Sequence, residues 1–134
     1  QTSHFSTLAF WMSIPIGLTI FNVILINEFP DYPADRIEGK ANLMVRFGKK
    51  TGSILYAAAG VGTVVSFAAG ILAGAPKVTW AFFPLVAILS LVPSWKMAKG
   101  EYRDRKKLER MCGATIVLNL LVVAAYTAGL LIEG

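Results

Sequence analysis

The sequence predicts an all-α protein, a polytopic transmembrane helix bundle. Hydrophobic residues make up 55% of its 134 residues and charged residues only 16%, whereas a soluble domain is usually about one quarter charged. Four stretches without charge are long enough, or nearly so, to cross a hydrocarbon core, which takes about 20 helical residues. The cations gather in two of the three connections between these stretches. Together these observations indicate an integral membrane protein.

The predicted spans and the cations between them set the topology. The first connection, 27–50, and the third, 96–110, carry all the Lys and Arg residues except Lys77. With four spans, both connections lie on one side of the membrane, and the positive-inside rule makes that side cytoplasmic. We therefore expect both chain ends to face outward, and the net charge of +5 to reflect topology rather than nucleic-acid binding. The predicted spans are 5–26, 51–75, 78–95 and 111–132.

Acidic residues concentrate directly after the first span, in the stretch 26–40, which reads INEFPDYPADRIEGK. Half of the eight carboxylates of the chain lie in it. Asn27, Asp31 and Asp35 recur every fourth residue, and in a helix this spacing stacks side chains on one face about one turn apart. The stretch therefore predicts a row of oxygen atoms at the cytoplasmic end of the first span.

Two prolines fall inside the same stretch. Pro30 cannot donate a hydrogen bond to the carbonyl of Ile26, and Pro33 cannot donate to that of Phe29. We therefore expect the helix to be interrupted here and the connection 27–50 to be irregular. Such backbone is tolerated near a membrane where it is buried in protein or lines a wet cavity, so the interruption itself suggests a site.

Carboxylates beside a membrane span need a partner, because burying them unpaired is costly. A divalent cation is one candidate, since Mg²⁺ prefers oxygen ligands and is commonly held by one or two carboxylates together with substrate phosphates. Asp31 and Asp35 supply such a pair, and Asn27 adds an uncharged oxygen. In a purely structural alternative, Arg36 and Lys40 neutralise the stretch.

Cations near the acidic stretch suit a ligand that carries phosphate. Arg36, Lys40 and Arg46 lie within or just after it, and a single metal ion would not neutralise a diphosphate. The combination favours a metal-bound phosphate at a membrane surface, without naming the ligand.

At this point the residues resemble a known family. The segment 27–48, NEFPDYPADRIEGKANLMVRFG, is similar to the second Asp-rich motif of the UbiA superfamily of intramembrane prenyltransferases, and most similar to the 1,4-dihydroxy-2-naphthoate polyprenyltransferases of menaquinone synthesis. The matching features are the DxxxD pair Asp31 and Asp35, the dipeptide 39–40 (Gly-Lys), and 45–48 (Val-Arg-Phe-Gly). The order of spans after the motif also fits.

The resemblance implies a nine-helix bundle around a cavity, of which this chain supplies the last four helices. It implies transfer of a polyprenyl group from polyprenyl diphosphate to an aromatic acceptor, with Mg²⁺ as cofactor, in the plasma membrane of a prokaryote. Asp31 and Asp35 would be catalytic metal ligands and Asn27 a weaker one. Lys40 and Arg36 would stabilise the diphosphate.

The chain lacks one part of the family's pattern. The family carries a first Asp-rich motif on an earlier helix, but the other carboxylates here, at Glu101, Asp104, Glu109 and Glu133, are scattered. We therefore expect these residues alone to be inactive and to need an N-terminal half with the first motif, in a longer chain or as a split enzyme.

The same residues are compatible with other functions. A transporter module could bind a cation at the Asp pair, although its ionisable groups should lie near the bilayer midplane. A structural subunit would not need Asp31 or Asp35. If the chain is part of a prenyltransferase, the acceptor could instead be 4-hydroxybenzoate, homogentisate, haem or a glyceryl phosphate lipid.

Polar residues inside the spans and the basic run 102–110 each have a common structural interpretation and a more specific functional one. Asn22, Asn119 and Tyr126 lie inside spans, where interhelical hydrogen bonding is the expected role and lining of an acceptor pocket the alternative. The basic run 102–110 is expected to set topology, and binding of anionic lipid headgroups is the alternative.

Overall fold

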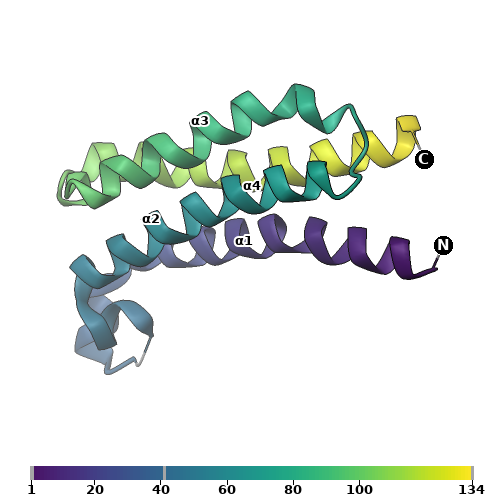
Figure 1. Cartoon of the computed structure of the whole chain (residues 1–134). Helices are drawn as coiled ribbons and strands as arrows, with labels where there is room; N and C mark the ends of the chain where they lie inside the picture. Colours follow the sequence, from purple (N-terminus) through teal and green to yellow (C-terminus); the bar gives the residue numbers. More distant parts are fainter. Residues whose placement is uncertain (1, 41, 134) are drawn as a thin grey trace.

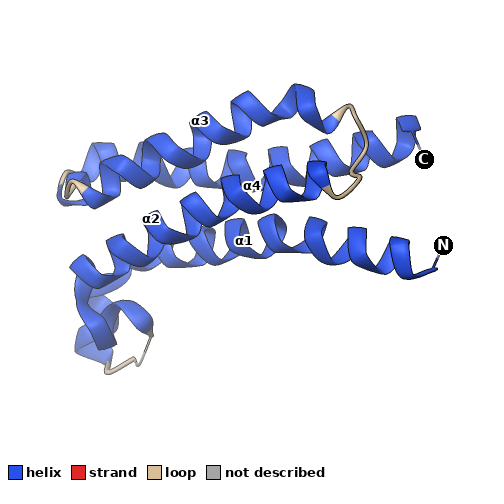
Figure 2. Ribbon diagram, viewed as in Figure 1, coloured by secondary structure: helices blue, strands red, loops and turns tan. Residues whose placement is uncertain are grey.

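The computed structural model describes residues 2–40 and 42–133, and within them the protein is an all-α bundle of four long helices without strands (Figure 1, Figure 2). Contacts join α1 to α2, α2 to α3, α3 to α4, and α4 back to α1. The helices therefore form a closed ring in which chain neighbours are antiparallel. The elements are α1 (Thr2–Glu38), α2 (Leu43–Leu72), α3 (Thr79–Ala98), the short 3-10 helix η1 (Glu101–Arg103) and α4 (Arg105–Glu133).

All four long helices contain a segment long and apolar enough to cross a membrane. This confirms the number of helices predicted from the uncharged stretches. Figure 1 places the two chain ends and the α2–α3 turn at one end of the bundle, and the α1–α2 and α3–α4 connections at the other. The two cation-rich connections therefore share one end, which we call the basic end.

Helix α1 runs without interruption through Pro30 and Pro33 to Glu38, so the expected break after the first span is wrong. Pro30 does leave the carbonyl of Ile26 without an intrahelical donor, but Sγ of Cys112 in α4 lies 4.0 Å from that oxygen as a weak donor. Neighbouring helices commonly stabilise prolines in membrane helices in this way. Most of the region 27–50 expected to be irregular is helical, because α1 continues to Glu38 and α2 begins at Leu43; the non-helical residue inside α2 is Gly48.

Glycine, rather than proline, ends α1. Gly39 has φ of 75°, a left-handed conformation that glycine adopts without a steric penalty. Its N–H donates to the carbonyl of Arg36 at 3.2 Å, and the N–H of Lys40 donates to that of Asp35 at 3.0 Å. This pair of bonds is a Schellman motif, and it brings Lys40 back toward the last turn of α1.

Polar side chains tie the helices together inside the bundle. Nδ2 of Asn22 donates to the carbonyl of Tyr56 at 3.1 Å, and Nδ2 of Asn119 donates to Oγ1 of Thr19 at 2.8 Å. The interhelical role expected for both asparagines is thus confirmed. The buried hydroxyl of Tyr126, in contrast, has no hydrogen-bond partner among the described residues.

Apolar side chains pack around these bonds in two clusters. One cluster lies toward the basic end and includes Phe29, Met44 and Tyr102; the other lies toward the chain ends and includes Phe67 and Val122. The first cluster joins α1, the start of α2 and η1, and therefore fixes the acidic part of α1 relative to both connections.

Candidate functional site

The carboxylates of α1 lie on one side of the helix. Because the helix is continuous, Glu28, Asp31, Asp35 and Glu38 fall within an arc of about 80° at 100° per residue, and Asn27 borders them. We call these five residues the acidic face. A spacing of every fourth residue identifies three of them; Glu28 and Glu38 join the same face through i,i+3 steps, which that spacing does not include.

The two aspartates of the predicted metal site differ in their surroundings. Asp31 is exposed, like Asn27, and it makes no hydrogen bond or ion pair with any described residue. Asp35 is buried, with only 8% of its surface exposed. Asp31 therefore presents a free carboxylate, whereas Asp35 is already held by the protein.

Lys40 and Asn42 hold the Asp35 carboxylate from the α1–α2 connection. Nζ of Lys40 lies 3.4 Å from Oδ1, and Nδ2 of Asn42 donates to Oδ2 at 2.9 Å. Lys40 also lies 3.5 Å from the carboxylate of Glu38. The hydrogen bond and the charge of Asp35, followed by those of Glu38, raise the pKa of Lys40 above its ordinary value.

Asn42 also begins the next helix. Its Oδ1 accepts the backbone N–H of Val45 at 2.9 Å, which makes it the N-cap of α2. One amide side chain thus joins the start of α2 to Asp35. Sequence reasoning gave Asn42 no role, although asparagine immediately before a helix is a recognisable N-cap signal.

The first turn of α2 folds back onto the acidic face. The backbone N–H of Met44 donates to Oε1 of Glu28 at 3.3 Å, and the Met44 side chain is fully buried. A bend at Gly48, where φ is 88° and ψ is 163°, allows this turn to leave the axis of the helix. The segment similar to Val-Arg-x-Gly in the family motif is therefore the segment that bends, and it carries Arg46 to an exposed position.

The three cations predicted to bind phosphate, Lys40, Arg36 and Arg46, do not lie close together in the structure. Lys40 contacts the acidic face, whereas Arg36 and Arg46 are exposed and form no ion pair within the described chain. Arg36 lines a separate shallow pocket of about 630 Å³ together with Tyr32 and Lys49, where the Lys49 ammonium lies 5.1 Å from the centre of the Tyr32 ring.

The acidic face carries the kind of oxygen donors that Mg²⁺ prefers. No group of three or more His, Cys, Asp or Glu side chains converges on one point in the part of the chain that the structure describes. However, Mg²⁺ is usually bound by one or two carboxylates, with waters and substrate phosphates as its other ligands. Asp31 and Asp35 match that requirement, and a complete cage is not needed.

Comparison with known proteins identifies the family. The model of the UbiA prenyltransferase family matches residues 1–119, which include the acidic face, the bend and the first half of α4. No curated protein and no solved structure matches the chain. Because the family match covers nearly nine tenths of the sequence, the chain belongs to the UbiA prenyltransferase family.

Proposed function

We propose that this chain takes part in the Mg²⁺-dependent transfer of a polyprenyl group from polyprenyl diphosphate to an aromatic acceptor, of the naphthoate class of quinone precursors. Family membership supports prenyl transfer within a membrane. The observation that carries the proposal for the site is the acidic face, because it places oxygen ligands at the same end of the bundle as both cation-rich connections. The similarity of segment 27–48 to the naphthoate enzymes supports the acceptor class.

In this proposal Asp31 and Asp35 hold Mg²⁺, with Asn27 as a weaker ligand. The ion would neutralise charge that develops on the diphosphate leaving group. The allylic C–O bond breaks, the diphosphate leaves with the electron pair, and a ring carbon of the acceptor forms the new C–C bond. The ring then loses a proton to regain its aromaticity.

Lys40 has a defined task in this scheme. Without ligand it neutralises Asp35, and we propose that its ammonium moves to a phosphate oxygen when Asp35 becomes a metal ligand. Charge-assisted hydrogen bonds to phosphate are among the stronger polar contacts. Arg46, exposed and without an ion pair among the described residues, would supply further positive charge to the diphosphate, and Arg36 would add to the positive potential from its separate pocket.

The acidic face would form one half of the complete site. We propose that a first Asp-rich motif, on an N-terminal half of the protein, supplies the facing carboxylates. The site would lie on the cytoplasmic side of a prokaryotic plasma membrane. A transporter would instead need ionisable groups near the bilayer midplane, whereas the acidic face occupies the last three turns of α1.

The direct test is Mg²⁺-dependent prenylation by membranes that contain the complete reading frame. We expect Asp31→Ala and Asp35→Ala each to lower turnover by about 100-fold or more, as the loss of one preorganised electrostatic group commonly does. Glu109→Ala is the matched control, because this exposed carboxylate of α4 pairs only with Arg105 among the described residues. Near-parental turnover in a folded double aspartate variant would exclude the proposed site.

The acceptor class is tested separately by competition. We expect prenylation of 1,4-dihydroxy-2-naphthoate to exceed that of 4-hydroxybenzoate and homogentisate, and a chelator to abolish it until Mg²⁺ is restored. If the protein prenylates another acceptor but not the naphthoate, the proposed metal site stands and the naphthoate assignment is wrong.

A further inference from the structure

A groove of about 270 Å³ runs along the outside of the α3–α4 pair near the basic end. Ile88 and Val92 of α3 and Ala114 of α4 form part of its apolar wall. Ile88 and Val92 are 57% and 43% exposed, so the wall opens on the outer surface of the bundle. No residue of α1 lines the groove, which makes it distinct from the acidic face.

Cations surround the basic end of this groove. Lys96, Lys107 and Arg110 line it together with Glu101. Lys107 and Lys99 lie 3.5 and 3.6 Å from the Glu101 carboxylate, which they neutralise. Lys96 and Arg110, however, form no ion pair with any described residue. The groove therefore has uncompensated positive charge at one end.

Apolar and cationic residues follow the same order on both helices. On α3, Ile88, Val92 and Lys96 recur every fourth residue and so lie along one line of the helix surface. On α4, Ala114 and Arg110 have the same spacing in the opposite chain direction. Since α3 and α4 are antiparallel, both lines change from apolar to cationic toward the same end, as a site for an amphiphilic anion requires.

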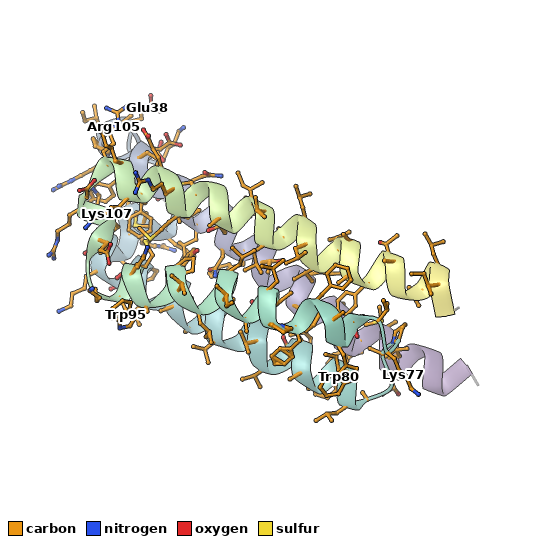
Figure 3. All side chains as sticks on the ribbon, turned by 90° about the horizontal axis from the view of Figure 1, so that it is seen from above. Glu38, Lys77, Trp80, Trp95, Arg105 and Lys107 are labelled. Atoms are coloured by element: carbon orange, nitrogen blue, oxygen red, sulfur yellow. The ribbon has the colours of Figure 1, made fainter. Side chains whose placement is uncertain are left out.

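A tryptophan marks the level at which the groove becomes cationic. Trp95 is 62% exposed, and Nζ of Lys99 lies 4.0 Å from its ring centre. Figure 3 shows Trp95 and Lys107 at one end of the bundle and Lys77 and Trp80 at the other. Exposed tryptophans typically lie at the membrane–water interface. The cationic end of the groove is therefore at headgroup level and its apolar wall at the level of acyl chains.

We propose that this groove binds an anionic phospholipid of the surrounding bilayer. The lipid phosphate lies between Lys96 and Arg110, and one acyl chain lies against Ile88, Val92 and Ala114. Basic pockets between transmembrane helices are a recognised mode of headgroup binding. A free phosphate ion would gain nothing from the apolar wall, and a zwitterionic lipid would gain less from the two unpaired cations because its own ammonium group offsets its phosphate charge.

The test measures lipid retention by the complete protein in detergent, using native mass spectrometry with added phosphatidylglycerol or phosphatidylcholine. We expect preferential retention of phosphatidylglycerol, and Lys96→Gln/Arg110→Gln should weaken it about 10- to 30-fold, since each cation near the surface contributes roughly fivefold or somewhat less. Arg105→Gln/Lys106→Gln is the matched control: it removes the same charge from the same connection outside the groove, and it should leave retention unchanged.

Further variants and competitors in the same experiment distinguish a bound lipid from other ligands of the groove. Ala114→Leu narrows the apolar part without changing charge and should also weaken retention. Equal weakening by the control pair would show diffuse charge attraction and overturn the proposal. Displacement by inorganic phosphate, or by a polyprenyl diphosphate at equal concentration, would assign the groove to a free anion or to the substrate instead. Loss of self-association in place of lipid loss would assign it to a second copy of the chain.

Discussion

Asp31 and Asp35 belong to one motif but are in different electrostatic states. The Asp35 carboxylate is buried and held by Lys40 and Asn42, whereas Asp31 is exposed without a partner among the described residues. Under the proposed function, a metal ion would approach Asp31 directly but would compete with Lys40 and Asn42 for Asp35. In the proposed metal site, Lys40 would therefore stabilise Asp35 without ligand and leave it when the ion binds.

The contact between Lys40 and Asp35 predicts a titration effect. Because the hydrogen bond and charge of Asp35 raise the pKa of Lys40 above 10.5, the folded protein favours the ammonium form. The contact therefore stabilises the fold below about pH 10.5 and is lost as the pH rises through the raised value. We expect Asp35→Asn to lower the pKa of Lys40 toward its ordinary value.

The measurement is the ¹³Cε chemical shift of Lys40 followed against pH in micelles. Asp31→Asn is the matched control, since it removes one negative charge from the same helix face without removing a contact of Lys40, and it should shift the midpoint less. If both substitutions shift the titration midpoint of Lys40 equally, the raised pKa of Lys40 is caused by the summed charge of the α1 carboxylates and not by the contact with Asp35.

At the level of elements, the bend in α2 depends on Gly48. Its φ of 88° and ψ of 163° lie in a region that is essentially restricted to glycine, while an added Cβ would meet no atom within 4 Å. The cost of Gly48→Ala is therefore one of backbone conformation, about 1–3 kcal/mol. We expect this substitution to destabilise the first turn of α2 and to release the Met44 contact with Glu28.

Gly113→Ala is the control for this prediction. Gly113 lies inside α4 with ordinary helical backbone, and its added Cβ would also meet no atom within 4 Å. In this helical position alanine should be neutral or stabilising by about 0.5–1 kcal/mol. Thermal unfolding and limited proteolysis near residue 48 measure the difference. If the two variants are equally stable and equally resistant, the bend at Gly48 does not contribute to stability.

The elements also show which parts of the structure the sequence could predict. The four helices follow from long uncharged stretches, because hydrocarbon thickness fixes their length. The predicted break at Pro30 and Pro33 was wrong, since α1 continues to Glu38. At Pro30 the freed carbonyl of Ile26 meets Sγ of Cys112, 86 residues along the chain, a contact that local residue spacing does not reveal. The contacts of Asp35 with Lys40 and Asn42 depend on the turn after Gly39, which residue spacing alone does not describe.

At the scale of the whole molecule, the two ends of the bundle differ in chemistry. One end combines the acidic face, the α1–α2 connection and the cationic end of the α3–α4 groove, while the other holds the two chain ends and Lys77 (Figure 1, Figure 3). This separation follows from an antiparallel ring with alternating connections. A prenyl diphosphate and an anionic lipid would therefore approach from the same side of the membrane but meet different helix pairs.

This arrangement predicts the sidedness of three exposed lysines. In a Cys112→Ser background, where serine keeps a donor toward Ile26, Lys50→Cys and Lys106→Cys mark the two basic connections and Lys77→Cys marks the opposite turn. The positive-inside rule places the first two in the cytoplasm. A membrane-impermeant maleimide should therefore label Lys77→Cys in right-side-out vesicles, and Lys50→Cys and Lys106→Cys in inverted ones. Labelling of Lys50→Cys and Lys106→Cys from opposite sides would mean that α2 and α3 together do not make two crossings, since two crossings return the chain to the side where it began.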